Sequence, residues 1–382
     1  MDGSATFFLE LGGIILVLGT LARMASAFGV SPIPLYLVAG LAFGEGGLVP
    51  LVTSQPFVDR GAQLGVILLL LMLGLEYTGD ELVRSMRTTS TAGGVDLVAN
   101  ALPGYLVGLL VGFGPVGSLY LGGITYISSS GVVAKLLVDL GWTGNRETPV
   151  VLSVLVFEDL AMAVILPILG AVALGGSVAG VVGSVGAAMV AVIVILALAS
   201  RHGDRLSRLA FSASDEVNLL TILGVTLIVA GVAEELHVSA AVGAFLVGIG
   251  VSGDAAHRAR DLLSPLRDLF AAVFFVFFGL STDPGSLPAV WLYVVALVVI
   301  TGATKLWTGW WAAGRSRIGS KARLRAGAAL LARGEFSIVI AELGVAAGTG
   351  ARLGALAAGY VLGMATLGPI VARWAARTTR PS

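Results

Sequence analysis

The sequence predicts an all-α integral membrane protein with about 13 transmembrane helices, in two inverted six-helix repeats that each contain one interrupted helix. Three observations predict this fold class. Of the 382 residues, 57 % are hydrophobic and only 12 % are charged, whereas a soluble protein carries roughly 25 % charged residues. Apolar runs of about 20 residues, the length that crosses a bilayer, recur along the chain. Basic residues are concentrated in every second loop between these runs.

The apolar runs define the predicted spans, with edges placed to within a few residues. They cover 5–22, 33–50, 61–79, 91–113, 117–138, 149–174, 178–200, 216–235, 238–253, 264–282, 288–313, 322–346 and 353–376. We expect a first repeat at 1–175, a linking helix at 176–209 and a second repeat at 210–382. An even number of spans in each half, joined by one linking span, gives the halves opposite orientations. No hydrophilic stretch is long enough for a soluble regulatory domain.

The positions of arginine and lysine predict the orientation of the chain. Positive residues favour cytoplasmic loops, and most of the 23 basic residues follow odd-numbered spans. Only Arg60 and Arg352 follow even-numbered spans, and Lys135, Lys305 and Arg333 lie within spans. We therefore expect a bacterial-type inner-membrane protein with its N-terminus outside and its C-terminus in the cytoplasm. Acidic and basic residues balance, which gives no indication of nucleic-acid binding, and the lack of cysteine excludes disulfides and thiol chemistry.

Four polar residues fall at one depth of the predicted bundle. At about 1.5 Å of rise per residue they lie roughly 12–16 Å from the cytoplasmic ends of their spans. These residues are Ser129, Asp159, Lys305 and Arg333. A hydrocarbon core about 30 Å thick places them near its midplane. Each charge there costs roughly 2.5–3.5 kcal/mol, so the ionisable groups must pair with one another or line a wet cavity.

Two spans carry polar interruptions at corresponding positions of the two halves. The fifth reads GGITYISSSGVVAKLL, and residues 128–131 form a poor helix centre because hydroxyls compete for backbone groups and glycine adds freedom. The twelfth reads AALLARGEFSIVIAEL, with Arg333, Gly334 and Glu335 at its middle. Paired interrupted helices are typical of transporter sites. Arg333 and Glu335 would neutralise the exposed helix ends; an internal ion pair between them is the alternative.

The sixth span carries two adjacent carboxylates in the run VFEDLAMAVILPIL. Neighbouring helical residues point about 100° apart, so Glu158 and Asp159 face different partners. We assign Glu158 to Lys305, although the sequence does not fix this division, and Asp159 to the ion pathway. An ionised Asp159 would bind a dehydrated monovalent cation with the hydroxyl groups of Ser129 and Ser130, and a protonated one would release it. A salt bridge that only fixes helix packing is the alternative.

A further acidic residue lies in the fourth span. Asp96 and Asn100 are four residues apart and share a helix face. Because Asp96 follows shortly after the predicted start of this span, we expect it to be solvated at the membrane interface. A polar entry funnel is the alternative.

Five segments, in order along nearly the whole chain, resemble the second branch of monovalent cation:proton antiporters, which includes Kef-type and bacterial Na⁺/H⁺ exchangers. They are ITYISSSGVVAKLL, VFEDLAMAVILPIL, AEELHVSAAVGAFLVGI, FFVFFGLSTDP and LLARGEFSIVI. The resemblance implies a Na⁺/H⁺-antiporter fold, with a mobile core against a dimerising scaffold, in a homodimer among membrane lipids. It implies that Asp159 carries the cation and the proton and that Lys305 pairs with the preceding residue. It implies no cofactor besides the transported K⁺ or Na⁺ and H⁺.

Glu158 departs from the family pattern. Kef-type potassium antiporters typically carry Gln at this position, electrogenic sodium antiporters Asp, and electroneutral ones often Asn. A permanent Glu158–Lys305 pair indicates one proton per cation, whereas a pair that opens and titrates allows two. Kef proteins also carry a C-terminal nucleotide-binding domain, which is not found up to Ser382. We therefore expect regulation through a separate cytoplasmic subunit, or none.

The sequence thus predicts a transporter, not an enzyme, that exchanges K⁺ or Na⁺ for protons by alternating access, with K⁺ favoured by the Kef-like segments. One alternative is a cation channel of similar architecture, which would conduct at fixed pH without obligatory proton flux. Another is a proton-coupled organic anion transporter, in which Arg333 would face the substrate. An intramembrane aspartyl protease needs a GxGD element, and YTGDEL at 77–82 lacks its first glycine.

Overall fold

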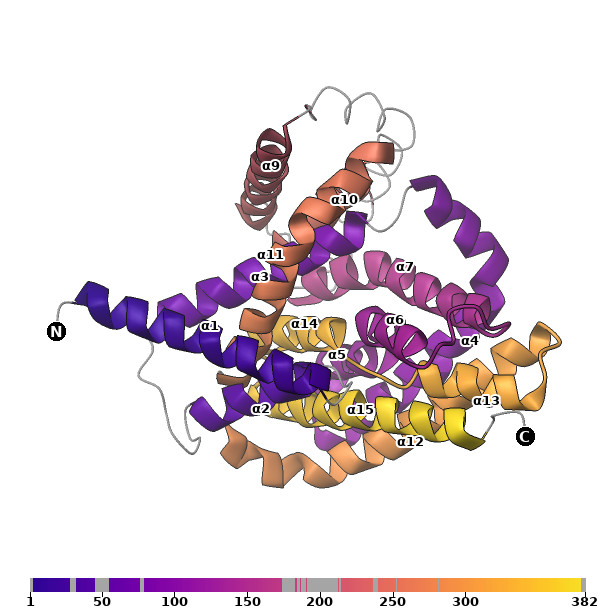
Figure 1. The fold of residues 1–382 in the computed structure, drawn as a ribbon. Helices are drawn as coiled ribbons and strands as arrows, with labels where there is room; N and C mark the ends of the chain where they lie inside the picture. The colour runs from indigo at the N-terminus through magenta and orange to yellow at the C-terminus, as the bar shows by residue number, and fades with distance from the viewer. Residues whose placement is uncertain are drawn as a thin grey trace.

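The computed structural model describes residues 3–27, 32–44, 55–75, 79–173, 212, 214–235, 240–251, 253–280 and 282–378, with three isolated positions between 183 and 190. Described segments are helices and the turns between them (Figure 1). The first half contains α1 (Gly3–Ala27), α2 (Ile33–Phe43), α3 (Gln55–Leu75), α4 (Gly79–Val111), α5 (Gly114–Tyr126), α6 (Ser130–Asp139) and α7 (Thr148–Ala173). The predicted linking helix at 176–209 lies almost wholly outside the described residues.

The remaining helices follow the same pattern of spans. They are α9 (Asp215–Glu235), α10 (Ala240–Gly250), α11 (Gly253–Leu280), α12 (Leu287–Arg315), α13 (Ser320–Ala329), α14 (Glu335–Gly344) and α15 (Ala351–Thr378), with short turns η1 (Pro284–Ser286) and η2 (Val345–Thr349). Within the described ranges, six helices are long and apolar enough to cross a membrane. The fifth and twelfth predicted spans each contain two short helices in place of one long one.

Two helices begin earlier than the predicted spans. α4 begins at Gly79 and α11 at Gly253, whereas the predicted spans begin at 91 and 264. The additional segments, GDELVRSMRTTS and GDAAHRARDLL, contain charged and polar residues that continue a helix but do not count towards an apolar run. As a result, Asp96 lies well inside α4 and not near its start.

The helices pack in two groups. One group joins α3, α9, α10 and α11, with α2 against α11, and its core contains Leu71, Ile222, Ala244 and Leu263. The other joins α4, α5, α7 and the helices from α12 to α15. Figure 1 shows α9 and α10 at one side of the molecule and the short helices α5, α6 and α14 nearer its middle. The two interrupted spans therefore meet within the second group.

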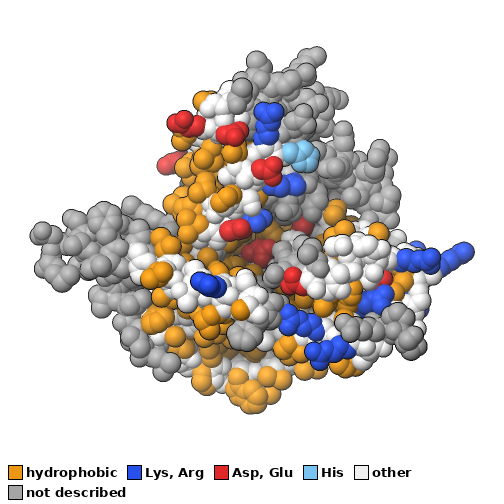
Figure 2. Space-filling view, in the orientation of Figure 1, with side chains coloured by type: hydrophobic (Ala, Val, Ile, Leu, Met, Phe, Trp, Pro, Cys, Tyr) orange, Lys and Arg blue, Asp and Glu red, His pale blue; other side chains and the backbone are white. Residues whose placement is uncertain are grey.

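The outer surface carries many apolar side chains. Leu16, Leu110 and Ile228 are each more than two-thirds exposed, and Figure 2 shows broad hydrophobic areas with the charged side chains in separate groups. A soluble protein rarely exposes contiguous apolar surface of this extent. The pattern is that of helices whose outer faces contact lipid.

Two glycines bring α12 close to α13. A Cβ atom on Gly309 would lie 2.6 Å from Cα of Gly327, so any larger residue would force the two backbones apart. This contact places α12, which carries Lys305, against the helix that leads into the second interruption.

Candidate functional site

The first interruption separates α5 from α6. α5 ends at Tyr126 and α6 begins at Ser130, so residues 127–129 are not helical and the break starts one residue earlier than predicted. Ile127 has extended backbone angles, with φ −75° and ψ 131°. Ser129 Oγ accepts a hydrogen bond from the amide of Val132 at 3.4 Å, which is the position of an N-cap for α6. Ser129 thus caps the start of α6, and Ile127 follows the end of α5.

The second interruption separates α13 from α14. α13 ends at Ala329 and α14 begins at Glu335, leaving residues 330–334 between them. Glu335 occupies the first turn of α14, where a carboxylate interacts favourably with the positive end of the helix dipole. The predicted interruption around Arg333 and Gly334 therefore falls at the C-terminal end of this segment.

The two interruptions hydrogen-bond to each other. The Ser129 amide donates to the Ala332 carbonyl at 2.9 Å, and Ser128 Oγ donates to the Leu330 carbonyl at 3.0 Å. Ser129 Oγ also donates to Glu335 Oε2 at 3.0 Å. Backbone groups that lost their helical partners at one break are thus satisfied by the other break, as burial requires.

Arg333 is fully buried and bonds to helix ends. Its guanidinium donates to five oxygen atoms: the carbonyls of Thr125 (3.0 Å), Leu330 (3.1 Å) and Leu331 (3.3 Å), Tyr360 Oη (3.2 Å) and Ser128 Oγ (3.3 Å). The three carbonyls lie at or just beyond the C-terminal ends of α5 and α13, where the helix dipole is negative. In the described part of the chain no ion pair joins Arg333 to Glu335, contrary to the alternative considered above.

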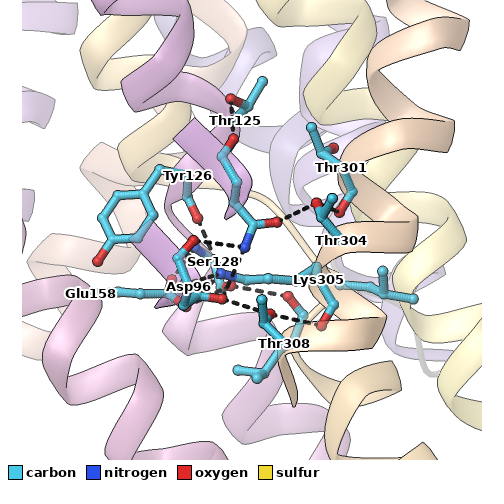
Figure 3. A network of polar contacts seen from close by, with 12 residues as sticks. Asp96, Thr125, Tyr126, Ser128, Glu158, Thr301, Thr304, Lys305 and Thr308 are labelled. Atoms are coloured by element: carbon cyan, nitrogen blue, oxygen red, sulfur yellow. Dashed lines mark hydrogen bonds and ion pairs between the residues drawn. The ribbon is translucent and has the colours of Figure 1, made fainter. Parts of the chain in front are cut away.

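Lys305 is the centre of a buried polar network (Figure 3). Its Nζ donates to Asp96 Oδ2 at 2.7 Å, to Glu158 Oε1 at 2.8 Å and to the Tyr126 carbonyl at 3.2 Å. The three donors of the ammonium are therefore all used. Two carboxylates from different helices share one ammonium, and assigning Lys305 to Glu158 alone misses half of this arrangement.

Glu158 also contacts the first interruption. Its Oε2 accepts a short hydrogen bond from the Ser128 amide. Its Oε1 lies 3.2 Å from Ser128 Oγ, whose one proton is shared between this oxygen and the Leu330 carbonyl. Glu158 is fully buried on α7. This carboxylate therefore links three parts of the site: α7, the break between α5 and α6, and Lys305 on α12.

Asp96 is part of this network, so the prediction of interfacial solvation is wrong. Its side chain is fully buried, and its Oδ1 accepts from Thr308 Oγ1 at 2.8 Å and Asn100 Nδ2 at 3.0 Å. Thr304 Oγ1 donates to Asn100 Oδ1 at 2.8 Å. The error came from the start assigned to the fourth span. The sequence did contain an indication of this contact. Asp96 and Asn100 are four residues apart, as are Thr304 and Thr308 on either side of Lys305, so one polar face on each helix could pair with the other.

The remaining predicted site residues lie nearby with different contacts. Asp159 follows Glu158 on α7, and its side chain is only 2 % exposed. Ser129 directs its hydroxyl to Glu335, and Ser130 opens α6 with a partly buried side chain. The serine that contacts Glu158 is Ser128, which the predicted binding set did not include.

The whole arrangement concentrates ionisable groups and interrupted helix ends in the interior of a bundle with an apolar outer surface. Carboxylates, hydroxyls and the carbonyls of unwound backbone are the oxygen ligands that bind dehydrated cations in transporters built on interrupted helices. Carboxylates inside a membrane bundle are costly unless they are paired, as Asp96 and Glu158 are, and they commonly mark ion or proton pathways. Carboxylates of this kind are able to bind a proton or a cation.

Comparison with known proteins places this geometry in a family. Residues 13–378 match the family model described as sodium/hydrogen exchanger, transmembrane. The chain is 35 % identical to the K(+)/H(+) antiporter subunit KhtU of Bacillus subtilis (strain 168) over 97 % of this chain and 94 % of that protein. It is 29 % identical to the ammonium/H(+) antiporter subunit AmhT of Alkalihalophilus pseudofirmus, over 95 % and 92 % of the two chains.

A solved structure shares the fold. The sodium proton antiporter MjNhaP1 from Methanocaldococcus jannaschii superposes with a TM-score of 0.69 over 97 % of both chains, at 18 % identity. The match supports the antiporter architecture expected from the sequence. Together with the family match and the antiporter relatives, it leads to one conclusion: this chain is a multi-pass membrane protein of the sodium/hydrogen exchanger family.

Proposed function

We propose that the protein exchanges a monovalent cation for protons across the inner membrane by alternating access, with Asp159 as the group that carries either ion. Glu158 lies beside it and joins it to the Lys305 network. Ser129 and Ser130 stand at the start of α6, from which they supply hydroxyl and backbone oxygens to the cation. Arg333 and Glu335 compensate the dipoles of the broken helices.

One observation carries this proposal most strongly. Glu158 and Asp159 are 0 % and 2 % exposed on a helix whose Glu158 side chain bonds to an interrupted segment. A pair of adjacent carboxylates buried in a membrane bundle serves a function by default, because its insertion is otherwise unfavourable. The antiporter relatives support the same reading.

We favour K⁺ over Na⁺ as the cation. The relative with 35 % identity is named as a K(+)/H(+) antiporter subunit, and the Kef-like segments in the sequence favour the same ion. The word "subunit" in the names of both relatives supports a separate cytoplasmic regulatory partner for this chain as well. No enzymatic step is part of the proposal.

The proposed assembly is a homodimer with an inverted internal repeat. The breaks at 127–129 and 330–334 occupy the fifth span of each half, which supports a repeat of 1–175 and 210–382 around a linking helix. The helices α4–α7 and α12–α15 would form the mobile core, and the group around α3 and α10 the scaffold. The alternation of basic residues supports an external N-terminus and a cytoplasmic C-terminus.

The test is cation-induced proton movement in everted membrane vesicles. With a pH gradient established, additions of K⁺, Na⁺ and Li⁺ should dequench a pH-sensitive dye in wild type, most strongly for K⁺. Asp159→Asn keeps the size of the side chain but cannot hold a proton and a cation in turn, so it should abolish the response. Asp283→Asn, at an exposed aspartate that caps η1, is the matched control and should respond like wild type.

Two results would contradict the proposal. Cation-induced proton movement that persists in Asp159→Asn would reject Asp159 as the carrier. Cation current at fixed pH without proton movement would identify a channel.

A further inference from the structure

Lys305 contacts two carboxylates, and they lie on different helices. Glu158 is on α7, next to the proposed carrier Asp159, whereas Asp96 is on α4. The Nζ–oxygen distances, 2.8 Å and 2.7 Å, are equivalent, and all three side chains are at most 1 % exposed. The ammonium therefore has one counter-ion within the proposed carrier helix and one outside it.

Asp96 belongs to a ladder of bonds between α4 and α12. Thr304 binds Asn100, Thr308 binds Asp96, and Lys305 binds Asp96 (Figure 3). Residues four apart on one helix thus meet residues three or four apart on the other, so the two helices are joined along one face. None of these bonds involves α7.

The two carboxylates differ in how they are held. Both oxygens of Asp96 bind groups of α4 and α12, namely Lys305 on one oxygen and Thr308 and Asn100 on the other. The carboxylate of Glu158 contacts both Lys305 on α12 and Ser128 in the first interruption. Asp96 is thus built into a helix–helix contact, whereas Glu158 bridges to the first interruption, beside the serines to which the proposed function assigns the cation.

We propose that Asp96 is a positioning residue that holds the Lys305 ammonium against α4, so that Glu158 can leave Lys305 during exchange without stranding a buried charge. The inference rests on the proposed function, in which the carboxylates of α7 change partners. A buried ammonium without a counter-ion is strongly unfavourable. The charged and titratable groups around Lys305 and its partners are Asp96, Glu158, Asp159, Tyr126 and Arg333.

Removal of the Asp96 carboxylate would leave Lys305 dependent on Glu158 for charge compensation. In Asp96→Asn, Glu158 is the sole remaining counter-ion, so its departure from Lys305 would leave the ammonium unpaired. Exchange should slow because that step becomes harder, while the cation concentration for half-maximal rate stays close to that of wild type. Asp96→Glu retains a carboxylate and should recover much of the rate.

Exchange measurements on protein reconstituted in liposomes test this directly. Asp96→Asn should lower the maximal rate about tenfold or more, with Asp96→Glu restoring it to within about threefold of wild type. Glu147→Gln is the matched control, since it also neutralises a buried carboxylate. Glu147 pairs with Arg325 Nε at a distance of 2.5 Å and is not part of the Lys305 network. It should leave the maximal rate near that of wild type. An Asp96→Glu rate as low as that of Asp96→Asn would overturn the proposal.

A double-mutant cycle in thermal unfolding provides a readout that does not depend on transport. In wild type, Lys305→Met removes the ion pairs with both Asp96 and Glu158. In the Asp96→Asn background one of these pairs is already lost, so Lys305→Met should lower the unfolding temperature less than it does in wild type. If the wild type exchanges ions but the two shifts in unfolding temperature are additive, the proposed role of Asp96 is wrong while the proposed function stands. A wild type without cation-dependent proton movement would overturn the proposed function, and with it the role of Asp96 in exchange.

Discussion

The two helix interruptions obtain their charges in different ways. The first, at 127–129, is made of uncharged residues, and all its charged partners come from elsewhere in the chain. Glu158 binds the Ser128 amide, Lys305 binds the Tyr126 carbonyl, and Arg333 of the second break binds the Thr125 carbonyl. The second, at 330–334, contains its own cation, Arg333, and leads directly into Glu335. One break is therefore neutralised by its neighbours and the other by its own sequence.

This difference separates a variable part of the site from a fixed one. Under the proposed function, charges supplied by α7 and α12 are able to change partners while the backbone of the first break stays in place. The bonds of Arg333 to helix-end carbonyls contain no carboxylate that would exchange ions, so we expect the second break to keep its shape during exchange. We therefore expect changes at the second break to act mainly on stability and changes around the first to act mainly on exchange.

The largest effect on stability should come from Arg333→Met. This change removes the guanidinium from five acceptors. It leaves the Leu331 carbonyl without its donor and the Thr125 carbonyl with only the Tyr360 hydroxyl at 3.5 Å. Hydrogen bonds to charged groups contribute about 1.5–3 kcal/mol each, so the free energy of unfolding should fall by at least about 3 kcal/mol. Thermal unfolding in detergent measures the loss.

The control for this variant is Arg323→Met. Arg323 lies on α13, stacks 3.3 Å over the ring of Trp310 and donates from Nε to the Trp310 carbonyl at 3.0 Å. Exposed contacts of this kind contribute about 0.5–1.5 kcal/mol. If both arginine variants lost the same stability, the guanidinium of Arg333 would not be holding the helix ends, and the contrast between the two breaks would fail.

A smaller effect is expected where the breaks touch. A Cβ atom at Gly334 would lie 2.6 Å from Ser129 Oγ and 2.8 Å from Ser129 Cβ, so Gly334→Ala should push the two segments apart. Overpacking of this kind costs about 1–3 kcal/mol. Ser129→Gly removes both clashing atoms, and Gly334→Ala should then be nearly neutral in that background. Unfolding of the two single variants and the double variant measures this coupling, and an unchanged cost in the Ser129→Gly background would show that the crowding lies elsewhere.

The sequence predicted the helices well because apolar length is a local property. Twelve of the thirteen predicted spans coincide with helices or helix pairs in the described residues, and both interruptions lie within a residue or two of the polar groups that suggested them. Serine, glycine and charged residues at the centre of an apolar run disfavour a continuous helix, because hydroxyls compete for backbone hydrogen bonds and glycine adds backbone freedom. The inverted repeat, the orientation and the dimer remain proposals.

The network around Lys305 was only partly predictable. The depth argument brought Glu158 and Lys305 together, but it depended on where each span was taken to start. Polar residues at the start of α4 concealed its true beginning, and Asp96 was assigned to the interface as a result. The choice of Ser128 over Ser129 as the contact of Glu158 depends on backbone angles inside the break, which no periodicity in the sequence encodes.

The smallest predicted change in stability sharpens the comparison most, because it matches two buried serines. Ser337 Oγ on α14 donates to the Ile124 carbonyl at 2.8 Å, and Ser128 Oγ donates to the Leu330 carbonyl and contacts Glu158. Ser337→Ala and Ser128→Ala each remove one hydroxyl. Ser337→Ala should lower the free energy of unfolding by about 1 kcal/mol, and Ser128→Ala by somewhat more, because its hydroxyl also contacts Glu158 and Arg333.

Their effects on exchange should differ. Ser128→Ala removes a bond to the carboxylate that bridges the first break and Lys305, so the rate of exchange in liposomes should fall severalfold. Ser337→Ala removes only a link between α14 and α5, and its rate should stay close to that of wild type. Equal rates for the two variants would mean that the first break is no more involved in exchange than the second, because each substitution removes one buried hydroxyl and only that of Ser128 contacts the Lys305 network.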